Sequence, residues 1–215
     1  MDKLKIYRKL KKLNQGVYHG SWAIWNGTDS KKVGDTSILE DIPKHEKTFA
    51  KLKPEFVMVA LNPSGSEKRQ PTKDDKKHPW RNFHSSANYD FCISKAFKGT
   101  PYYGAYMTDF IKISLGSDAK EAKNAYDRLP KARKRENVAK FKAELDAIGV
   151  DNIKVIIALG ETTMRYLRQA KKEMGDEYKK IKLVKVWHYG YVRYLGEGGE
   201  NVYVAKVHEQ LGLKK

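Results

Sequence analysis

The stretch that decides the fold is Phe56-Val57-Met58-Val59-Ala60-Leu61, which continues into Asn62-Pro63-Ser64-Gly65. Six consecutive apolar residues, preceded by Lys53-Pro54, have the length and composition of a β-strand. The proline and glycine that follow predict a tight turn at the carboxyl end of this strand.

Three further apolar runs, at residues 105–113, 153–159 and 182–187, alternate with amphipathic segments along the chain. This alternation is typical of parallel strands that are joined by crossover helices. We therefore predict an α/β fold, in which a three-layer α/β/α domain surrounds a central, mainly parallel four-stranded sheet.

Helices are predicted at residues 3–13, 88–97, 118–150 and from 161 onward, and one more short strand at 202–207. In the third helix, apolar side chains recur at three- and four-residue steps, which places them on one core-facing side. These side chains are Val138, Phe141, Leu145 and Ile148. We expect residues 1–50 to form an N-terminal helical extension packed on the domain, and residues 51–215 to form the domain itself.

The composition excludes several classes of protein. Of the 215 residues, 40% are apolar and 11% aromatic, which is enough to close one core and too much for a disordered chain. No apolar run approaches the roughly 20 residues of a membrane span, and the N-terminus lacks the apolar region of a secretory signal. These features predict a cytoplasmic protein without membrane contact, and we expect a monomer.

Cys92 is the single cysteine, which excludes an intramolecular disulfide and an iron–sulfur cluster. A zinc site built from His78, His84 and Cys92 lacks a fourth ligand and matches no common zinc spacing. We therefore expect neither a metal nor a cofactor.

The chain is strongly basic, because 43 Lys and Arg against 26 Asp and Glu give a formal charge of +17. The electrostatic field of such a charge concentrates polyanions around the protein, so nucleic acid is the leading candidate partner. The alternative is a lysine-rich surface without a polyanion partner, since the charge is spread along the chain. The basic segment 131–135 leaves a similar choice open, between a solvated helix face and a patch that contacts phosphates.

Polar residues follow three of the predicted strands. They are Asn62 after the first strand, Asp109 in the second and His188 after the last. Because the carboxyl ends of parallel strands border one crevice, we expect these three segments to converge there. The proline after Asn62 stiffens that turn, and Gly65 lets a ligand approach the backbone. The alternative for Asn62 is a side chain that only ends the strand.

At these positions the sequence resembles the uracil-DNA glycosylase superfamily. Val59-Ala60-Leu61-Asn62-Pro63-Ser64-Gly65 is similar to the Gly-x-Asn-Pro-Gly motif of its mismatch-specific and single-strand-selective branches. His78-Pro79-Trp80-Arg81-Asn82-Phe83 is similar to the His-Pro plus aromatic segment that follows in those enzymes. Segments 105–109 and 155–160 and then His188 follow in the family's order, so the resemblance covers about residues 50–195.

The resemblance implies the superfamily's fold and its reaction, which is hydrolysis of the N-glycosidic bond of an aberrant base after the nucleotide is flipped out. It implies that Asn62 orients the attacking water and that His188 hydrogen-bonds the base oxygen on which negative charge develops. Phe83 would stack on the base. The alternatives are that Phe83 is only an aromatic residue of the core, and that His188 is a histidine satisfied beside Trp187 and Tyr189. The implied partner is DNA, single-stranded DNA included, or another nucleic acid.

The resemblance also implies contacts to the base edge from Asp109 and from the backbone around Leu61, Ser64 and Gly65. Tyr189, Tyr191 and Arg193 stand where the family has a loop that inserts into the duplex, so they would contact the nucleic acid.

Two departures from the family's pattern bear on activity. Ala60 replaces the first glycine of the motif and Ser64 is interposed before Gly65, so the chain looks closer to a branch with Leu-Asn-Pro-Ser turns. Asp109 stands where the high-activity uracil enzymes place an asparagine. An ionised carboxylate only accepts hydrogen bonds, which predicts preference for an amino-bearing base edge over uracil.

Two other functions fit the same residues. The first is a module of the same fold that binds nucleic acid or a nucleotide and does no chemistry. The second is an unrelated nucleotide-binding α/β protein with phosphate at Gly160 and the helix after it. Neither a Gly-x-Gly-x-x-Gly motif nor a lysine-terminated phosphate loop accompanies Gly160.

Overall fold

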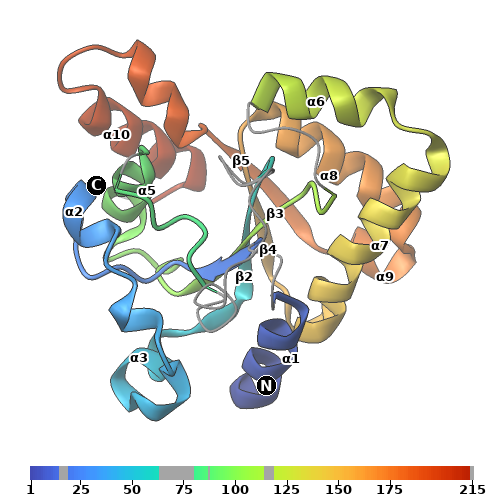
Figure 1. The fold of residues 1–215 in the computed structure, drawn as a ribbon, viewed down its shortest axis with the longest axis horizontal. Helices are drawn as coiled ribbons and strands as arrows, with labels where there is room; N and C mark the ends of the chain where they lie inside the picture. The colour runs from blue at the N-terminus through green and yellow to red at the C-terminus, as the bar shows by residue number, and fades with distance from the viewer. Residues whose placement is uncertain (15–18, 63–79, 87, 114–118, 214–215) are drawn as a thin grey trace.

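The centre of the computed structural model is a five-stranded sheet in the order β1-β3-β2-β4-β5 (Figure 1). The strands are β1 Gly20–Trp22, β2 Lys53–Ala60, β3 Ala105–Asp109, β4 Val155–Leu159 and β5 Lys182–Val186. The structure describes residues 1–14, 19–62, 80–86, 88–113 and 119–213. β1 pairs antiparallel with β3, and every other pair in the sheet is parallel.

The predicted α/β class and mainly parallel sheet are confirmed, and the sheet has one strand more than predicted. The extra strand, β1, is only three residues long, which is too short to show an apolar run in the sequence. β3 ends at Asp109, four residues before its predicted end. Its pairing with the chain after β2 nevertheless continues, since Ile111 N donates to the Leu61 carbonyl oxygen at 2.9 Å.

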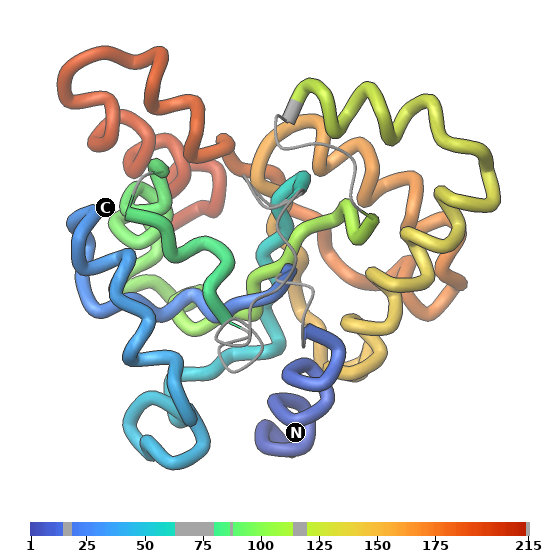
Figure 2. The backbone as a smooth tube through the Cα atoms, viewed as in Figure 1, coloured from blue at the N-terminus to red at the C-terminus, as the bar shows by residue number. Residues whose placement is uncertain are grey.

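Helices cover both faces of the sheet (Figures 1 and 2). The longer ones are α1 Lys3–Asn14, α5 Asp90–Phe97, α6 Ala119–Arg128, α7 Lys131–Ile148, α8 Glu161–Met174 and α10 Gly199–Leu211. The shorter α-helices are α2 Ser30–Val33, α3 Glu46–Lys51 and α9 Asp176–Lys179. The 3₁₀ turns are η1 Ser37–Leu39, η2 Ile42–Lys44, η3 Val150–Asn152 and η4 Tyr189–Tyr194.

Alternating side chains of each strand enter two separate cores. In β2, Val57 and Val59 belong to a first buried cluster with residues of α1, α7 and α8, whereas Met58 and Ala60 belong to a second with residues of α5 and α10. β2 is apolar from Phe56 onward because its two faces are both covered.

The predicted strand at residues 202–207 is wrong, because this segment lies within helix α10. Tyr203 and Val207, four residues apart, are fully buried, while Val202 is 50% exposed. This is the periodicity of a helix with one buried face. The three valines favour a strand by propensity, but packing of α10 against α5 and β5 overrides that preference.

The predicted helix at 118–150 is two helices, α6 and α7, with Pro130 at the start of the second. Proline has no N–H to donate and clashes with the preceding turn, so α6 ends before it. The predicted core stripe on α7 is confirmed, since Val138, Phe141, Leu145 and Ile148 are all buried. No helix in the described part of the chain has the length and apolar character to cross a membrane.

Candidate functional site

The carboxyl ends of β2, β3, β4 and β5 meet at one edge of the sheet, because these strands are parallel. Ala60 of β2 pairs with Asp109 of β3, and Asn62 follows Ala60 by two residues. His188 lies two residues after Val186, the last residue of β5. β4 separates β2 from β5, so these two strands are about 10 Å apart. Asn62, Asp109 and His188 therefore share one edge, while their roles stay predictions.

The first motif is only partly described by the structure. Asn62 is half-buried at the end of β2, and the Leu61 side chain is buried in the first cluster. Ser64, Gly65 and residues 78–79 of the second motif lie outside the described residues. The base contacts predicted for Ser64 and Gly65 are therefore not tested by the geometry.

Asp109 is buried at the end of β3 and is held by Asn82. The side-chain nitrogen Nδ2 of Asn82 donates to Asp109 Oδ2 at 2.6 Å and to the His19 carbonyl oxygen at 2.9 Å. The other carboxyl oxygen, Oδ1, is buried and has no hydrogen-bond partner among the described residues. A buried polar atom in this state is unusual, because such atoms are normally satisfied by the protein, by water or by an ion.

Burial raises the pKa of the Asp109 carboxyl to about 7. The positive charge of Lys112 and the hydrogen bond from Asn82 oppose this rise, and the negative charges of Glu144 and Asp90 add to it. Near neutral pH the carboxyl is therefore protonated in a large fraction of molecules. A protonated carboxyl donates as well as accepts, so Asp109 is not restricted to the acceptor role expected for an ionised aspartate.

Phe83 has a left-handed backbone conformation with φ of 62°, which is uncommon for a residue with a side chain. Two hydrogen bonds hold this conformation. Phe83 N donates to Asn82 Oδ1 at 3.0 Å, and Trp25 Nε1 donates to the Phe83 carbonyl oxygen at 3.0 Å. The Phe83 ring is buried in the second cluster. Asn82 thus connects the segment that carries Phe83 to Asp109.

His188 is a neutral imidazole with a defined tautomer. The Gly190 N–H donates to His188 Nδ1 at 3.0 Å, so the single proton of the neutral ring is on Nε2. Burial, with the nearby charge of Arg193, lowers the pKa of His188 to about 4. Nε2 has no hydrogen-bond partner among the described residues. His188 therefore presents a spare N–H donor at neutral pH.

Gly160, at the end of β4, makes room for this histidine. Its φ is 99°, a conformation that L side chains rarely adopt, and a Cβ atom there would lie 3.3 Å from the His188 Cβ. A larger residue at position 160 would push His188 from its place.

Tyr189 stacks on His188 and lies in the electrostatic field of the acidic residues of the site. Its ring stacks on the His188 ring with centroids 4.3 Å apart and planes 22° apart. Burial raises the pKa of Tyr189 well above its usual value, and the negative charges of Asp90 and Asp109 add to the rise. The Tyr189 hydroxyl is thus within electrostatic range of both carboxyls, and its predicted contact with nucleic acid stays a prediction.

Asn82 and Asp90 were not identified as site residues from the sequence. Asp90 begins α5, accepts a hydrogen bond from Ser85 N at 2.8 Å, and has its pKa raised to about 6 by burial. The available signal was an acidic residue in the first turn of a predicted helix, which commonly marks a cap. Asn82 lies within the quoted second motif, but its link to Asp109 is a tertiary contact that the sequence does not reveal.

An exposed aromatic ridge follows the site along η4. Trp187 and Tyr191 meet edge to face with ring centroids 5.0 Å apart, and Tyr191 and Tyr194 are 5.8 Å apart. Tyr191 is 47% exposed and Tyr194 71%. The Arg193 guanidinium lies 5.5 Å from the centre of the Tyr194 ring. Solvent-exposed rings beside a cation suit stacking with nucleobases.

The fold and this edge define an α/β protein whose mainly parallel sheet has buried, titratable side chains at its carboxyl end. Among the described residues, no three His, Cys, Asp or Glu side chains form a cluster that could hold a metal ion. A scan of the chain against protein-family models finds no match, and a search of curated proteins finds none. The function is therefore argued from the site itself.

Proposed function

We propose that this protein hydrolyses the N-glycosidic bond of an aberrant base in DNA, as a member of the uracil-DNA glycosylase superfamily. The observation that carries the proposal is His188, a neutral imidazole with a spare Nε2–H at the same sheet edge as Asn62. The motif order along the chain supports the same assignment.

Breaking this bond moves an electron pair onto the base, so negative charge develops on a base carbonyl oxygen. The Nε2–H of His188 donates a hydrogen bond to that oxygen, and a donor fixed in place before the reaction stabilises such charge most effectively. The Asn62 amide orients a water molecule, because an amide is not basic enough to take its proton. The water oxygen bonds to the sugar carbon, and a water proton ends on the released base.

The base is recognised by Asp109 and Phe83 in this proposal. Asn82 binds the Asp109 carboxyl and the Phe83 backbone N–H, so the two residues are held in one geometry. Asp109 Oδ1 is buried and has no hydrogen-bond partner among the described residues, and in this proposal its partner is the edge of the flipped base. The buried Phe83 ring supplies an apolar contact.

The test of this function is base release from single-stranded oligonucleotides that carry uracil, hypoxanthine, xanthine or an alkylated base. Release is read as strand cleavage after alkali treatment of the abasic product. A second candidate function, binding without chemistry, is favoured by the exposed rings of Tyr191 and Tyr194. Binding of every oligonucleotide without release of any base would establish that second function in place of the first.

Base preference is expected to change with pH through Asp109. Because the Asp109 pKa is raised to about 7, its carboxyl donates a hydrogen bond below that pH and only accepts above it. Release of uracil, which presents carbonyl oxygens, should therefore fall relative to release of 3-methyladenine, which presents an amino group, as the pH rises through neutrality. The measurement is the ratio of the two release rates between about pH 6 and about pH 8.

The Asp109→Asn variant is the matched control for this pH effect. Its amide does not titrate and can still accept the hydrogen bond from Asn82, so the ratio should become independent of pH and shift toward uracil. An unchanged pH dependence in the variant would assign the effect to another group, such as Asp90, whose pKa is raised to about 6.

Tyr191 is expected to contribute to strand binding by stacking. Tyr191→Ala should weaken binding of a single-stranded oligonucleotide by about 1–3 kcal/mol, the usual contribution of one base–aromatic stack. Tyr191→Phe keeps the ring and should bind like the wild type. Fluorescence anisotropy measures both variants, and wild-type affinity in Tyr191→Ala would remove the ridge from the binding surface.

A further inference from the structure

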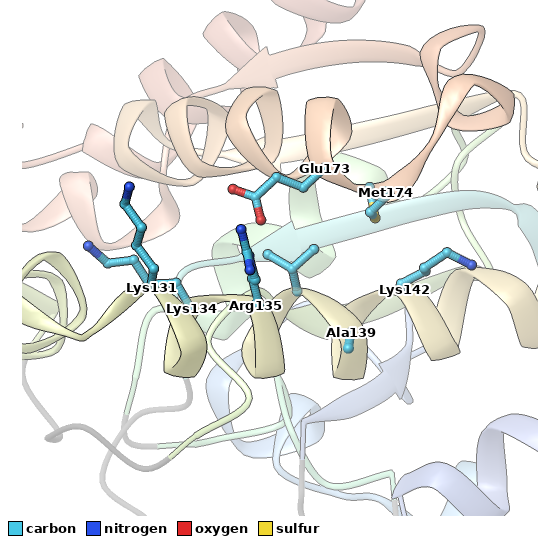
Figure 3. A pocket seen from close by; sticks show the side chains of 8 residues that line it. Lys131, Lys134, Arg135, Ala139, Lys142, Glu173 and Met174 are labelled. Carbon is cyan, nitrogen blue, oxygen red and sulfur yellow. The ribbon is translucent and has the colours of Figure 1, made fainter.

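A basic groove of about 600 Å³ lies between α7 and α8, on the helical layer over the first core cluster (Figure 3). It is lined by Lys131, Lys134, Arg135, Val138, Ala139, Lys142, Glu173 and Met174. Four of these residues are cationic and one is acidic. No residue of the carboxyl-edge site lines the groove, so it is a separate surface.

Part of the positive charge of the groove is not compensated by ion pairs within α7. Glu136 forms ion pairs with Arg133 and with Lys140, the latter at 2.8 Å, and neither cation lines the groove. Lys131 and Arg135 have no ion pair among the described residues. These two cations are therefore available to an anion.

The remaining lysines are placed along the same groove. Lys134 Nζ donates to the Asp127 carbonyl oxygen at 2.8 Å, a neutral partner that leaves its charge in place. Lys142 pairs with Asp146 at 2.7 Å, so its charge is partly offset. From Lys131 to Lys142 the helix rises about 16 Å, which is long enough to follow several nucleotides of a strand.

The floor of the groove is apolar, which separates it from a helix face that is merely solvated. Val138 and Met174 form the floor, and each of them is only 7% exposed. All four cations lie on α7, so the groove has one cationic wall beside its apolar floor. This arrangement matches a nucleic-acid strand, which has phosphates on one side and sugars and bases on the other.

We propose that the groove between α7 and α8 binds the phosphate backbone of a single strand of nucleic acid. The phosphates contact Lys131, Lys134 and Arg135, and the sugars rest on the apolar floor. Glu173 is the one unfavourable group, because its carboxylate repels phosphate. This binding does not depend on the base-release reaction.

The first test is charge reversal in the full-length chain. Lys131→Glu/Arg135→Glu should weaken binding of a labelled, mixed-sequence single-stranded DNA at least about tenfold at low salt, and should lower the log–log salt slope by about 1.4, or about 0.7 for each lost phosphate contact. The control Lys31→Glu/Lys98→Glu makes the same charge change on the opposite helical layer, at two exposed lysines. An equal loss in both variants would overturn the groove in favour of a general field effect.

The second test works in the opposite direction and does not risk unfolding. Glu173→Gln removes the repulsive charge and keeps the shape of the groove, so affinity for the same DNA should rise by a factor of a few. Unchanged or weaker binding would contradict the proposal.

The third test is competition between the bound DNA and poly-glutamate. The concentration of negative charge that displaces the DNA is compared for poly-glutamate and for unlabelled DNA. A lower concentration for poly-glutamate would identify an acidic protein as the ligand and overturn the proposal. Asn62→Ala should not change any of these affinities, so failure of the glycosylase proposal is read separately.

Discussion

Replacing Asn62 by alanine is expected to lower the rate of base release by about 10²-fold or more while leaving oligonucleotide affinity nearly unchanged. The reason is that Asn62 acts on the water and not on the bound base. Removing a residue that contributes only in the transition state lowers kcat and leaves binding of the ground state unchanged.

The measurement pairs single-turnover base release with anisotropy on the same oligonucleotide, and it uses a base that the wild type removes. Asn201→Ala is the matched control, because Asn201 is an exposed asparagine on α10 that has no role in the proposed reaction. Full activity in Asn62→Ala would show that the catalytic residue lies elsewhere. A parallel loss of affinity would instead make Asn62 a base-binding group.

β2 and β4 could be predicted from the sequence because each of them contains a continuous apolar run. β2 and β4 are buried on both faces, so burial leaves its mark at nearly every position. The same reasoning failed for α10, where valines produced a strand-like composition in a helix with one buried face. β1 could not be found at all, since three residues have no periodicity and its place depends on pairing with β3.

The sequence predicted that Asn62, Asp109 and His188 lie at one edge of the sheet, because strand ends are local features. The protonation states of these residues could not be predicted, because they depend on contacts between distant segments. The tautomer of His188 requires the backbone N–H of Gly190 in a particular turn, and the raised pKa of Asp109 requires burial against other elements. Asn82 acts on Asp109 across 27 positions of the chain. Such contacts are visible only in the folded molecule.

A buried ion pair next to the site carries the second large expected effect. Lys112 Nζ and Glu144 Oε1 are 2.8 Å apart, and their side chains are only 3% and 5% exposed. The Thr108 hydroxyl donates to Glu144 Oε2 at 2.7 Å, and Lys112 N donates to Asn137 Oδ1 at 2.6 Å. This network joins α7 to the end of β3, directly beside Asp109.

Glu144→Leu is therefore expected to lower the free energy of unfolding by about 3–5 kcal/mol, because it leaves the buried Lys112 ammonium without its ion-pair partner. Replacing all three polar side chains of the network together should lower the free energy of unfolding much less. The triple variant Lys112→Met/Glu144→Leu/Thr108→Val removes both charges and the Thr108 hydroxyl together, so most of the loss should be recovered. Urea denaturation of the three proteins measures the differences. A loss below about 1 kcal/mol in Glu144→Leu would mean that Lys112 reaches water, as exposed ion pairs do. Recovery in the triple variant would show that the network adds little net stability, since an apolar replacement is then tolerated by the fold.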